Sequence, residues 1–169
     1  MSAYVALLRA INVGGTSLPM PTLVQMCRAA GFERPRTYIA SGNALFESRC
    51  GEPRVREALM RQLADYFGKP IGVQVRTAAQ LAAVLAANPF PEAPPNRTVA
   101  IFLEAAPPAG ALADVRGRKR ERLACGTREI YVHYPDGIGA SRLVIPAAAT
   151  GTARNLNTIG ALAALAAHH

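Results

Sequence analysis

The first half of the chain alternates strand-like apolar runs with helical spacing. Strands are expected where apolar residues are continuous or alternate with polar ones, over residues 4–11, 36–40, 44–47 and 71–75. Apolar residues recur at helical spacing from about Pro19 to a stop at Gly31, and again over residues 53–67 with a stop at Gly68. This half therefore has the order β-α-β-β-α-β, the split β-α-β or ferredoxin-like arrangement.

The second half has similar elements in a permuted order. Thr77 and Gln80 have the spacing of a capping box at the start of one helix, and an alanine- and leucine-rich segment through Leu165 closes the chain as another. A weaker helix is expected near Leu112. Strands are expected over residues 98–103, 130–134 and 142–145.

These elements predict an α+β fold of duplicated ferredoxin-like halves, with antiparallel sheets and helices packed on one face. The first half covers residues 1–76. The second is a permuted α+β half over residues 77–169, which we expect to pack against the first as one compact unit. A chain of 169 residues is long enough to bury such a core.

Three short polar segments interrupt the apolar pattern, at residues 9–15, 37–43 and 152–158. In a β-α-β-β-α-β unit the first two strands run in the same direction, so the loops that follow them emerge at the same end of the sheet. The N-terminus of the first helix points to that end and adds its partial positive charge. The first two segments should therefore meet there. The third would join them if the last helix packs back across the first half.

Together these segments form a set rich in hydrogen-bond donors, which suits an anion. Arg9 is central to it, because an arginine inside an apolar strand needs a fixed anionic partner or a ligand. The expected ligand-binding residues are Arg9, Asn12, Gly14, Gly15, Ser41, Asn43, Arg154 and Asn155.

Each part of this set also has a structural interpretation. Arg9 could pair with an internal carboxylate instead of a ligand; the candidates are Glu33, Glu47 and Asp65. Residues 12–15 could form a glycine-rich turn, since they match neither a dinucleotide fingerprint nor a P-loop. Thr152 or Asn157 could serve as the N-cap of the last helix.

The composition is strongly basic, with a net charge of +8 and a pI near 10.1. Such a balance suggests nucleic acid as a partner. However, 17 of the 19 basic residues are arginines, and codon bias in a GC-rich genome also produces that composition. The densest basic stretch, residues 116–122, is of a kind that is more often a solvated face. RNA-binding sheets need exposed aromatic residues, and the central strands offer only Tyr4 and Phe46. Nucleic acid is therefore the second choice of partner.

Other classes of function find little support. Ser41 lacks a Gly-x-Ser-x-Gly elbow, and His133 is the only histidine apart from the terminal pair, which could belong to a tag. No metal site and no cofactor is expected, because no ligand set has suitable spacing. Three scattered cysteines, the lack of a signal-peptide pattern and the lack of an apolar run near ~20 residues predict a cytoplasmic protein without a membrane partner.

Four segments carry a resemblance to a known family: LLRAINVGG (7–15), TYIASGN (37–43), NPF (88–90) and TARNLNT (152–158). In this order they resemble the signature segments of the bacterial family called domain of unknown function 1697, over essentially the whole chain. The resemblance implies a cytoplasmic α+β protein built from a duplicated ferredoxin-like unit, and it implies no activity. The family usually has glycine and tryptophan where this chain has Ala10 and Leu156, and both departures look like packing changes.

The sequence thus favours a polar cleft that binds a small phosphate- or carboxylate-bearing ligand, with catalysis left open. A non-catalytic nucleic-acid-binding module is the alternative. A structural or partner-binding protein without a ligand is the third interpretation.

Overall fold

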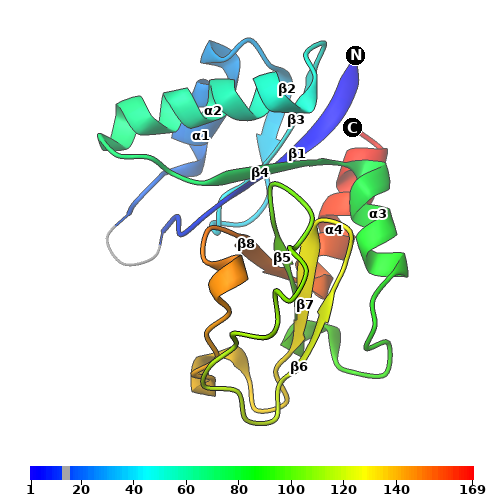
Figure 1. Cartoon of the computed structure of the whole chain (residues 1–169). Coiled ribbons are helices and arrows are strands. Elements are labelled where there is room, and N and C mark those ends of the chain that lie inside the picture. The colour runs from blue at the N-terminus through cyan, green and yellow to red at the C-terminus, as the bar shows by residue number, and fades with distance from the viewer. Residues whose placement is uncertain (13–15) are drawn as a thin grey trace. The chain divides into compact units, whose positions relative to one another are not determined.

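The computed structural model describes residues 1–12 and 16–169 (Figure 1). Gly14 and Gly15, two of the expected ligand-binding residues, lie outside these ranges. The contacts group the chain into two compact units: Met1–Leu81 with Ala161–His169, and Ala82–Gly160. The division expected at residue 76 and the packing of both halves into one body stay predictions.

The first unit contains a four-stranded antiparallel sheet in the order β2-β3-β1-β4. Its strands are β1 (Ser2–Leu8), β2 (Glu33–Thr37), β3 (Asn43–Ser48) and β4 (Val73–Thr77). β1 and β2 are both antiparallel to β3, so they run in the same direction, as the sequence predicted. This is the strand order of the ferredoxin-like arrangement.

Helices α1 (Met20–Ala29) and α2 (Glu52–Phe67) cover one face of this sheet (Figure 1). Alternate residues of β1 face the helices, because side chains along a strand point to opposite faces in turn. Phe46 lies at the centre of this core, fully buried, with its ring stacked on that of Phe32 at a centroid distance of 4.1 Å. The core residues of the helices are Leu23, Met26, Cys27, Val55, Leu59 and Leu63.

The second unit contains another four-stranded antiparallel sheet, in the order β6-β7-β5-β8. Its strands are β5 (Thr98–Phe102), β6 (Arg122–Cys125), β7 (Glu129–His133) and β8 (Thr152–Asn155). Counted from its own first strand, this sheet repeats the order of the first one. The fold is therefore α+β with duplicated ferredoxin-like halves.

In the second half one helix precedes the four strands in the chain and the other follows them. α3 (Ala78–Ala86) precedes β5 and α4 (Leu156–Ala167) follows β8. The Thr77–Gln80 capping box that starts α3 is confirmed, with reciprocal hydrogen bonds of 2.8 and 3.2 Å. Three 3-10 helices lie in the connections: η1 (Pro95–Arg97), η2 (Ile138–Ala140) and η3 (Pro146–Ala148). No helix among residues 1–12 and 16–169 has the length and apolarity needed to cross a membrane.

Several local expectations for the second half are wrong. Residues near Leu112 form turns, and residues 142–145 contribute only one isolated bridge, from Val144 to Arg116. β6 lies at the end of the basic stretch, where no strand was expected. Residues 152–155 form β8 before the last helix starts at Leu156, because they pair with the central strand β5. Sheet pairing therefore overrides the local polar pattern in this segment.

Candidate functional site

The segment after β1 contacts the turn after β2 at one end of the first sheet. The main-chain N–H of Leu8 donates to the carbonyl of Gly42 at 2.9 Å, and Asn12 Nδ2 donates to the carbonyl of Ala40 at 2.6 Å. Leu7 and Asn43 are partners in the register of β1 and β3. The structure thus brings Asn12 to the segment that contains Ser41 and Asn43. The ligand expected there stays a prediction.

Both asparagines at this end hold the backbone together. Asn12 has a positive φ of 60°, and its amide also bonds Leu18, with Nδ2 donating to the carbonyl at 3.1 Å and Oδ1 accepting from the N–H at 2.8 Å. The amide of Asn43 is fully buried and donates to the carbonyl of Tyr38 and to the hydroxyl of Ser41, at 2.9 and 3.0 Å. The expected donors of these two side chains therefore serve loop closure.

Arg9 lies in a different environment from the one expected. β1 ends at Leu8, so Arg9 is exposed beyond the strand instead of being enclosed within it. Its main-chain N–H donates to the carbonyl of Gly72 at 2.9 Å. Among the residues that the structure describes, Arg9 makes no ion pair, and the candidate partner Glu47 pairs with Arg34 at 2.9 Å. The argument from a buried charge does not apply to Arg9.

Arg9 lines a hollow of about 180 Å³ in the first unit. Lys69 and Thr16 line the same hollow, and none of its described lining residues is acidic. Two cations and a hydroxyl thus face an open space that an anion could enter. Lys69 was not predicted as a site residue, and a lone lysine between Gly68 and Pro70 carries no signal for one.

Arg154 and Asn155, the other expected site residues, line a second hollow of about 180 Å³ that lies within the second unit. Arg97, from η1, lines it too, together with the buried Tyr134 and the exposed Ile138. Asn155 Oδ1 accepts the Thr158 N–H at 2.9 Å and so caps α4. The expected cap at Thr152 or Asn157 is therefore wrong. The sequence did not single out Arg97, which follows a proline-rich loop.

The charge of Arg154 is partly desolvated in this hollow. Burial lowers the pKa of its guanidinium to about 10. An arginine pKa is normally above 12, so its surroundings as a whole disfavour the cation. Burial also raises the pKa of the Tyr134 hydroxyl, a group that is already a neutral hydrogen-bond donor at physiological pH. A cation in such surroundings gains more from an incoming anion than one in water does.

His133 belongs to a structural cluster. Arg122 Nε donates to His133 Nδ1 at 3.2 Å, pairs with Glu92, and lies 4.6 Å from the centre of the Phe90 ring. Asn88 Oδ1 accepts the Phe90 N–H at 2.9 Å, so the Asn-Pro-Phe segment is joined to β6 and β7 through this cluster. Burial, and after it the charge of Arg122, lowers the pKa of His133.

This lowered pKa predicts a loss of stability in mild acid. The unfolded chain takes up a proton at His133 near its ordinary pKa of 6.5, whereas the folded chain resists protonation until a lower pH. The contribution is therefore fully present above pH 6.5 and is lost as the pH falls below it. Urea unfolding followed between about pH 8 and pH 5 should show this decline. The variant His133→Asn should show a smaller decline, and an equal decline would contradict the assignment.

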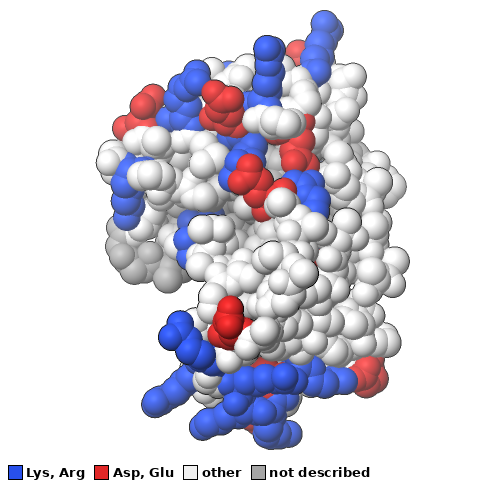
Figure 2. Space-filling view, viewed as in Figure 1, with Lys and Arg blue, Asp and Glu red and all other residues white. Residues whose placement is uncertain are grey.

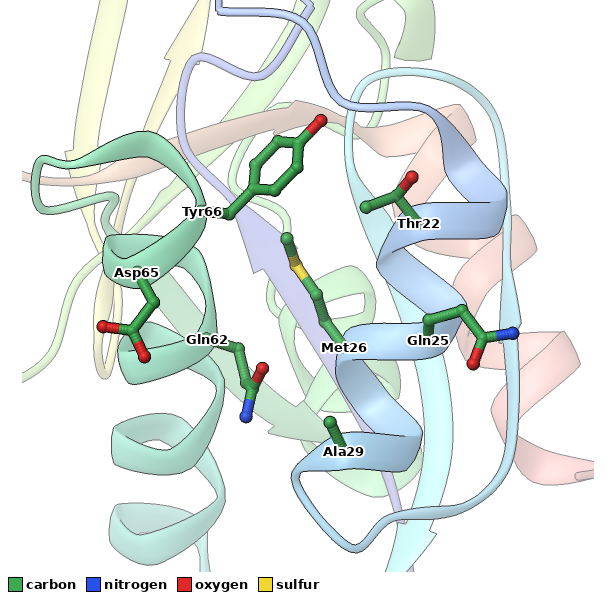
Figure 3. A pocket seen from close by; sticks show the side chains of 7 residues that line it. All are labelled: Thr22, Gln25, Met26, Ala29, Gln62, Asp65 and Tyr66. Carbon is green, nitrogen blue, oxygen red and sulfur yellow. The ribbon is translucent and has the colours of Figure 1, made fainter.

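A further hollow of about 370 Å³ lies between α1 and α2 (Figure 3). Met26 and Tyr66 lie between the two helices, and the other lining residues are Thr22, Gln25, Ala29, Gln62 and Asp65. Among its described lining residues the single charged one is a carboxylate, so the hollow does not suit an anion. Within residues 1–12 and 16–169, no three His, Cys, Asp or Glu residues are placed to hold a metal ion.

Three comparisons with known proteins add a family and a fold. The model of the family described as "Protein of unknown function (DUF1697)" matches residues 1–131. No curated protein matches the chain. A solved structure of the conserved bacterial protein SP0830 from Streptococcus pneumoniae is similar, with a TM-score of 0.82 and 23% identity over 99% of both chains. At that identity the likeness establishes the fold alone.

Proposed function

The chain belongs to the DUF1697 family of proteins of unknown function, and on that premise we propose that it binds a small ligand carrying a phosphate or carboxylate group. The proposed site is the hollow of the second unit lined by Arg97 and Arg154. The three cysteines are free thiols, which supports a cytoplasmic location for this activity.

The observation that carries the proposal is the half-buried charge of Arg154. Removing a cation from water costs free energy, and here burial lowers the pKa of the guanidinium to about 10. Nη1 of Arg154 already donates to the main-chain carbonyl of Ala153 at 2.9 Å, and an oxyanion in the hollow would add charge-assisted hydrogen bonds that strengthen where water is excluded. Arginine also presents a planar fork of N–H groups that matches the geometry of phosphate and carboxylate.

Two neighbours add to the same preference. Arg97 brings a second cation to the hollow, and its Nη1 donates to the carbonyl of Pro135. Tyr134 also lines the hollow, and its hydroxyl is neutral at physiological pH. None of the residues that the structure describes in its lining is acidic. Two cations and a hydroxyl fit one phosphate or carboxylate group, and the volume limits the ligand to a small molecule.

The proposal predicts stabilisation of the full-length chain by small oxyanions. Inorganic phosphate or citrate at about ten times its dissociation constant should add about 1.4 kcal/mol, or about 3–6 °C in melting temperature. Arg154→Gln should weaken binding by about 10- to 100-fold, since a charge-assisted pair is worth about 1.5–3 kcal/mol. Thermal shift and isothermal titration calorimetry would measure both effects. Each variant is compared with and without the anion, so any effect of the substitution on the fold cancels.

Arg9→Gln is the matched control, because it removes one arginine from the first unit's hollow. We expect it to bind the anion as the parent chain does. The assignment to the second unit would fail if Arg9→Gln removed the stabilisation and Arg154→Gln kept it. The Arg9 and Lys69 hollow would then be the site.

A further inference from the structure

A group of exposed cations lies on the loops next to β6 and β7 in the second unit. Figure 2 shows Lys and Arg side chains crowded at the lower end of the view, over the second unit, with few carboxylates between them. We call the exposed residues of this group the basic loop surface: Arg116, Arg118, Lys119, Arg120 and Arg142. Arg120 pairs with Asp136 at 2.7 Å. The other four make no ion pair with any described residue.

The backbone that carries these cations is fixed. Arg116 and Val144 exchange two main-chain hydrogen bonds, of 3.0 and 2.8 Å, which join the two segments of the surface. Gly117 has a φ of +72°, and a side chain there would meet the main chain of Arg142. Glycine is therefore needed both for the turn and for the close approach of the two segments.

Glu121 joins the same two segments from below the surface. This carboxylate is only 6% exposed, and it accepts the Lys119 N–H at 2.7 Å and the hydroxyl of Ser141. These hydrogen bonds hold the pKa of Glu121 below its ordinary value, so it stays charged at physiological pH. Its main-chain carbonyl accepts from Arg118 Nε at 2.8 Å. One buried anion thus orders a loop whose exposed side chains are nearly all cations.

This arrangement keeps several exposed cations close together, which favours an anionic partner. Exposed like charges repel one another, and a flexible loop would let them spread apart. Here the hydrogen bonds of Glu121 and the contact at Gly117 keep them close. A partner that binds a fixed surface loses less conformational entropy than one that must order a mobile loop.

We propose that the basic loop surface binds the phosphate backbone of duplex nucleic acid. A duplex presents about one charge per 1.7 Å of its axis, and residues 116–120 span at most about 14 Å, so several phosphates lie within reach at once. All four aromatic side chains of the second unit, Phe90, Phe102, Tyr131 and Tyr134, are buried. The surface therefore lacks the stacking platforms that single strands use, and it offers contacts to phosphates without reading the sequence.

The test is binding of the full-length chain to labelled DNA and RNA duplexes of about 20 base pairs, measured by fluorescence anisotropy between about 50 and 200 mM salt. The test variant is Arg118→Gln, Lys119→Gln, Arg142→Gln. The matched control is Arg28→Gln, Arg49→Gln, Arg54→Gln, which removes the same charge from exposed sites of the first unit. Melting temperatures of all three proteins should agree within a few degrees, since exposed charges contribute little to stability.

We expect the parent chain to bind at low salt with an affinity that falls steeply as salt rises. The test variant should bind at least about 10-fold more weakly, and its slope against log salt should be smaller by about 2–3, one phosphate contact for each cation removed. The control should stay within about twofold. Equal losses in both variants, or no binding by the parent at low salt, would overturn the proposal. Binding to anionic lipid vesicles without binding to duplexes would overturn it in favour of a membrane surface.

Glu121→Ala distinguishes the effect of the ordered loop on duplex binding from the effect of net charge. This variant loses one negative charge, so its net charge rises by one. Tighter binding would therefore show that only net charge matters. We expect weaker binding, because the two segments lose their common acceptor. The milder variant Glu121→Gln keeps an acceptor for Lys119 and Ser141, so its affinity for the duplex should lie between those of the parent chain and Glu121→Ala. Arg154→Gln should leave duplex binding within about twofold, which separates this proposal from the small-ligand site.

Discussion

Phe46→Ala should destabilise the first unit by about 3–5 kcal/mol, the usual cost of deleting a buried phenyl ring. The ring is fully buried in the core between the sheet and α1 and α2, and it stacks on Phe32 at 4.1 Å. β3 lies between β1 and β2, so the cavity would open in the middle of the sheet. Amide hydrogen exchange of β1 and β3 would measure the loss in this unit directly.

Tyr66→Ala is the control for Phe46→Ala, because it removes an aromatic ring that is 49% exposed from α2. Its expected cost is below about 1 kcal/mol, as for most surface substitutions. Similar losses in the two variants would mean that Phe46 does not pack as described.

Asn12→Ala should cost about 2–4 kcal/mol, although Asn12 is exposed and looks like a ligand donor in the sequence. Its amide makes three hydrogen bonds to the main chain, two to Leu18 and one to Ala40. These bonds hold the segment after β1 against the turn after β2. Alanine would also have to adopt the positive φ of 60°, which it does only at a cost. Urea unfolding and hydrogen exchange would measure the loss.

Asn12→Gly separates the cost of the lost hydrogen bonds from the cost of the positive φ. Glycine accepts the positive φ but has no amide, so it should recover only the backbone part, about 1 kcal/mol. Ser17→Ala, an exposed neighbour, should be close to neutral. A neutral Asn12→Ala variant would return Asn12 to the list of ligand candidates.

Much of the first unit could be predicted because its pattern is local. Val55, Leu59 and Leu63 recur along one face of α2, and all three are buried. Boundaries were less predictable where backbone geometry decides them. The apolar run from Tyr4 continues to Ile11, yet β1 stops at Leu8, because Ala10 and Asn12 adopt positive φ. Nothing in the run of residue types marks that change.

In the second unit the errors occur where strand pairing decides the structure. Residues 152–155 resemble a helix start, and only their pairing with β5 makes them a strand. β6 is an edge strand with half-exposed residues, so its pattern shows no clear alternation. Pairing of this kind depends on residues far away in the chain, and a single sequence does not reveal them.

The residue types of the candidate site could be predicted from the sequence. Which of their side-chain donors are already bonded to the main chain could not. Asn12 and Asn43 have the right chemistry for an anion, but their amides bond to main-chain carbonyls. Which carbonyls lie within reach follows from the fold alone. Arg97 and Lys69 joined the candidates only when their hollows could be seen. A single cation in a loop is too common to be a signal.

The hydrogen bonds of Glu121 that hold the basic loop surface also affect how readily proteases cut the protein there. Residues 116–122 contain five lysines and arginines, the residues after which trypsin-like proteases cut. Such an enzyme must draw its target into an extended form, so cleavage here requires the loop to detach from residues 141–144 first. The rate of cutting then follows the population of the detached loop. That population grows as the pH falls through the lowered pKa of Glu121, because a protonated carboxyl no longer holds Ser141 and the Lys119 N–H as strongly. A segment rich in cleavage sites is thus held closed by the buried Glu121 carboxylate together with the main-chain hydrogen bonds between Arg116 and Val144.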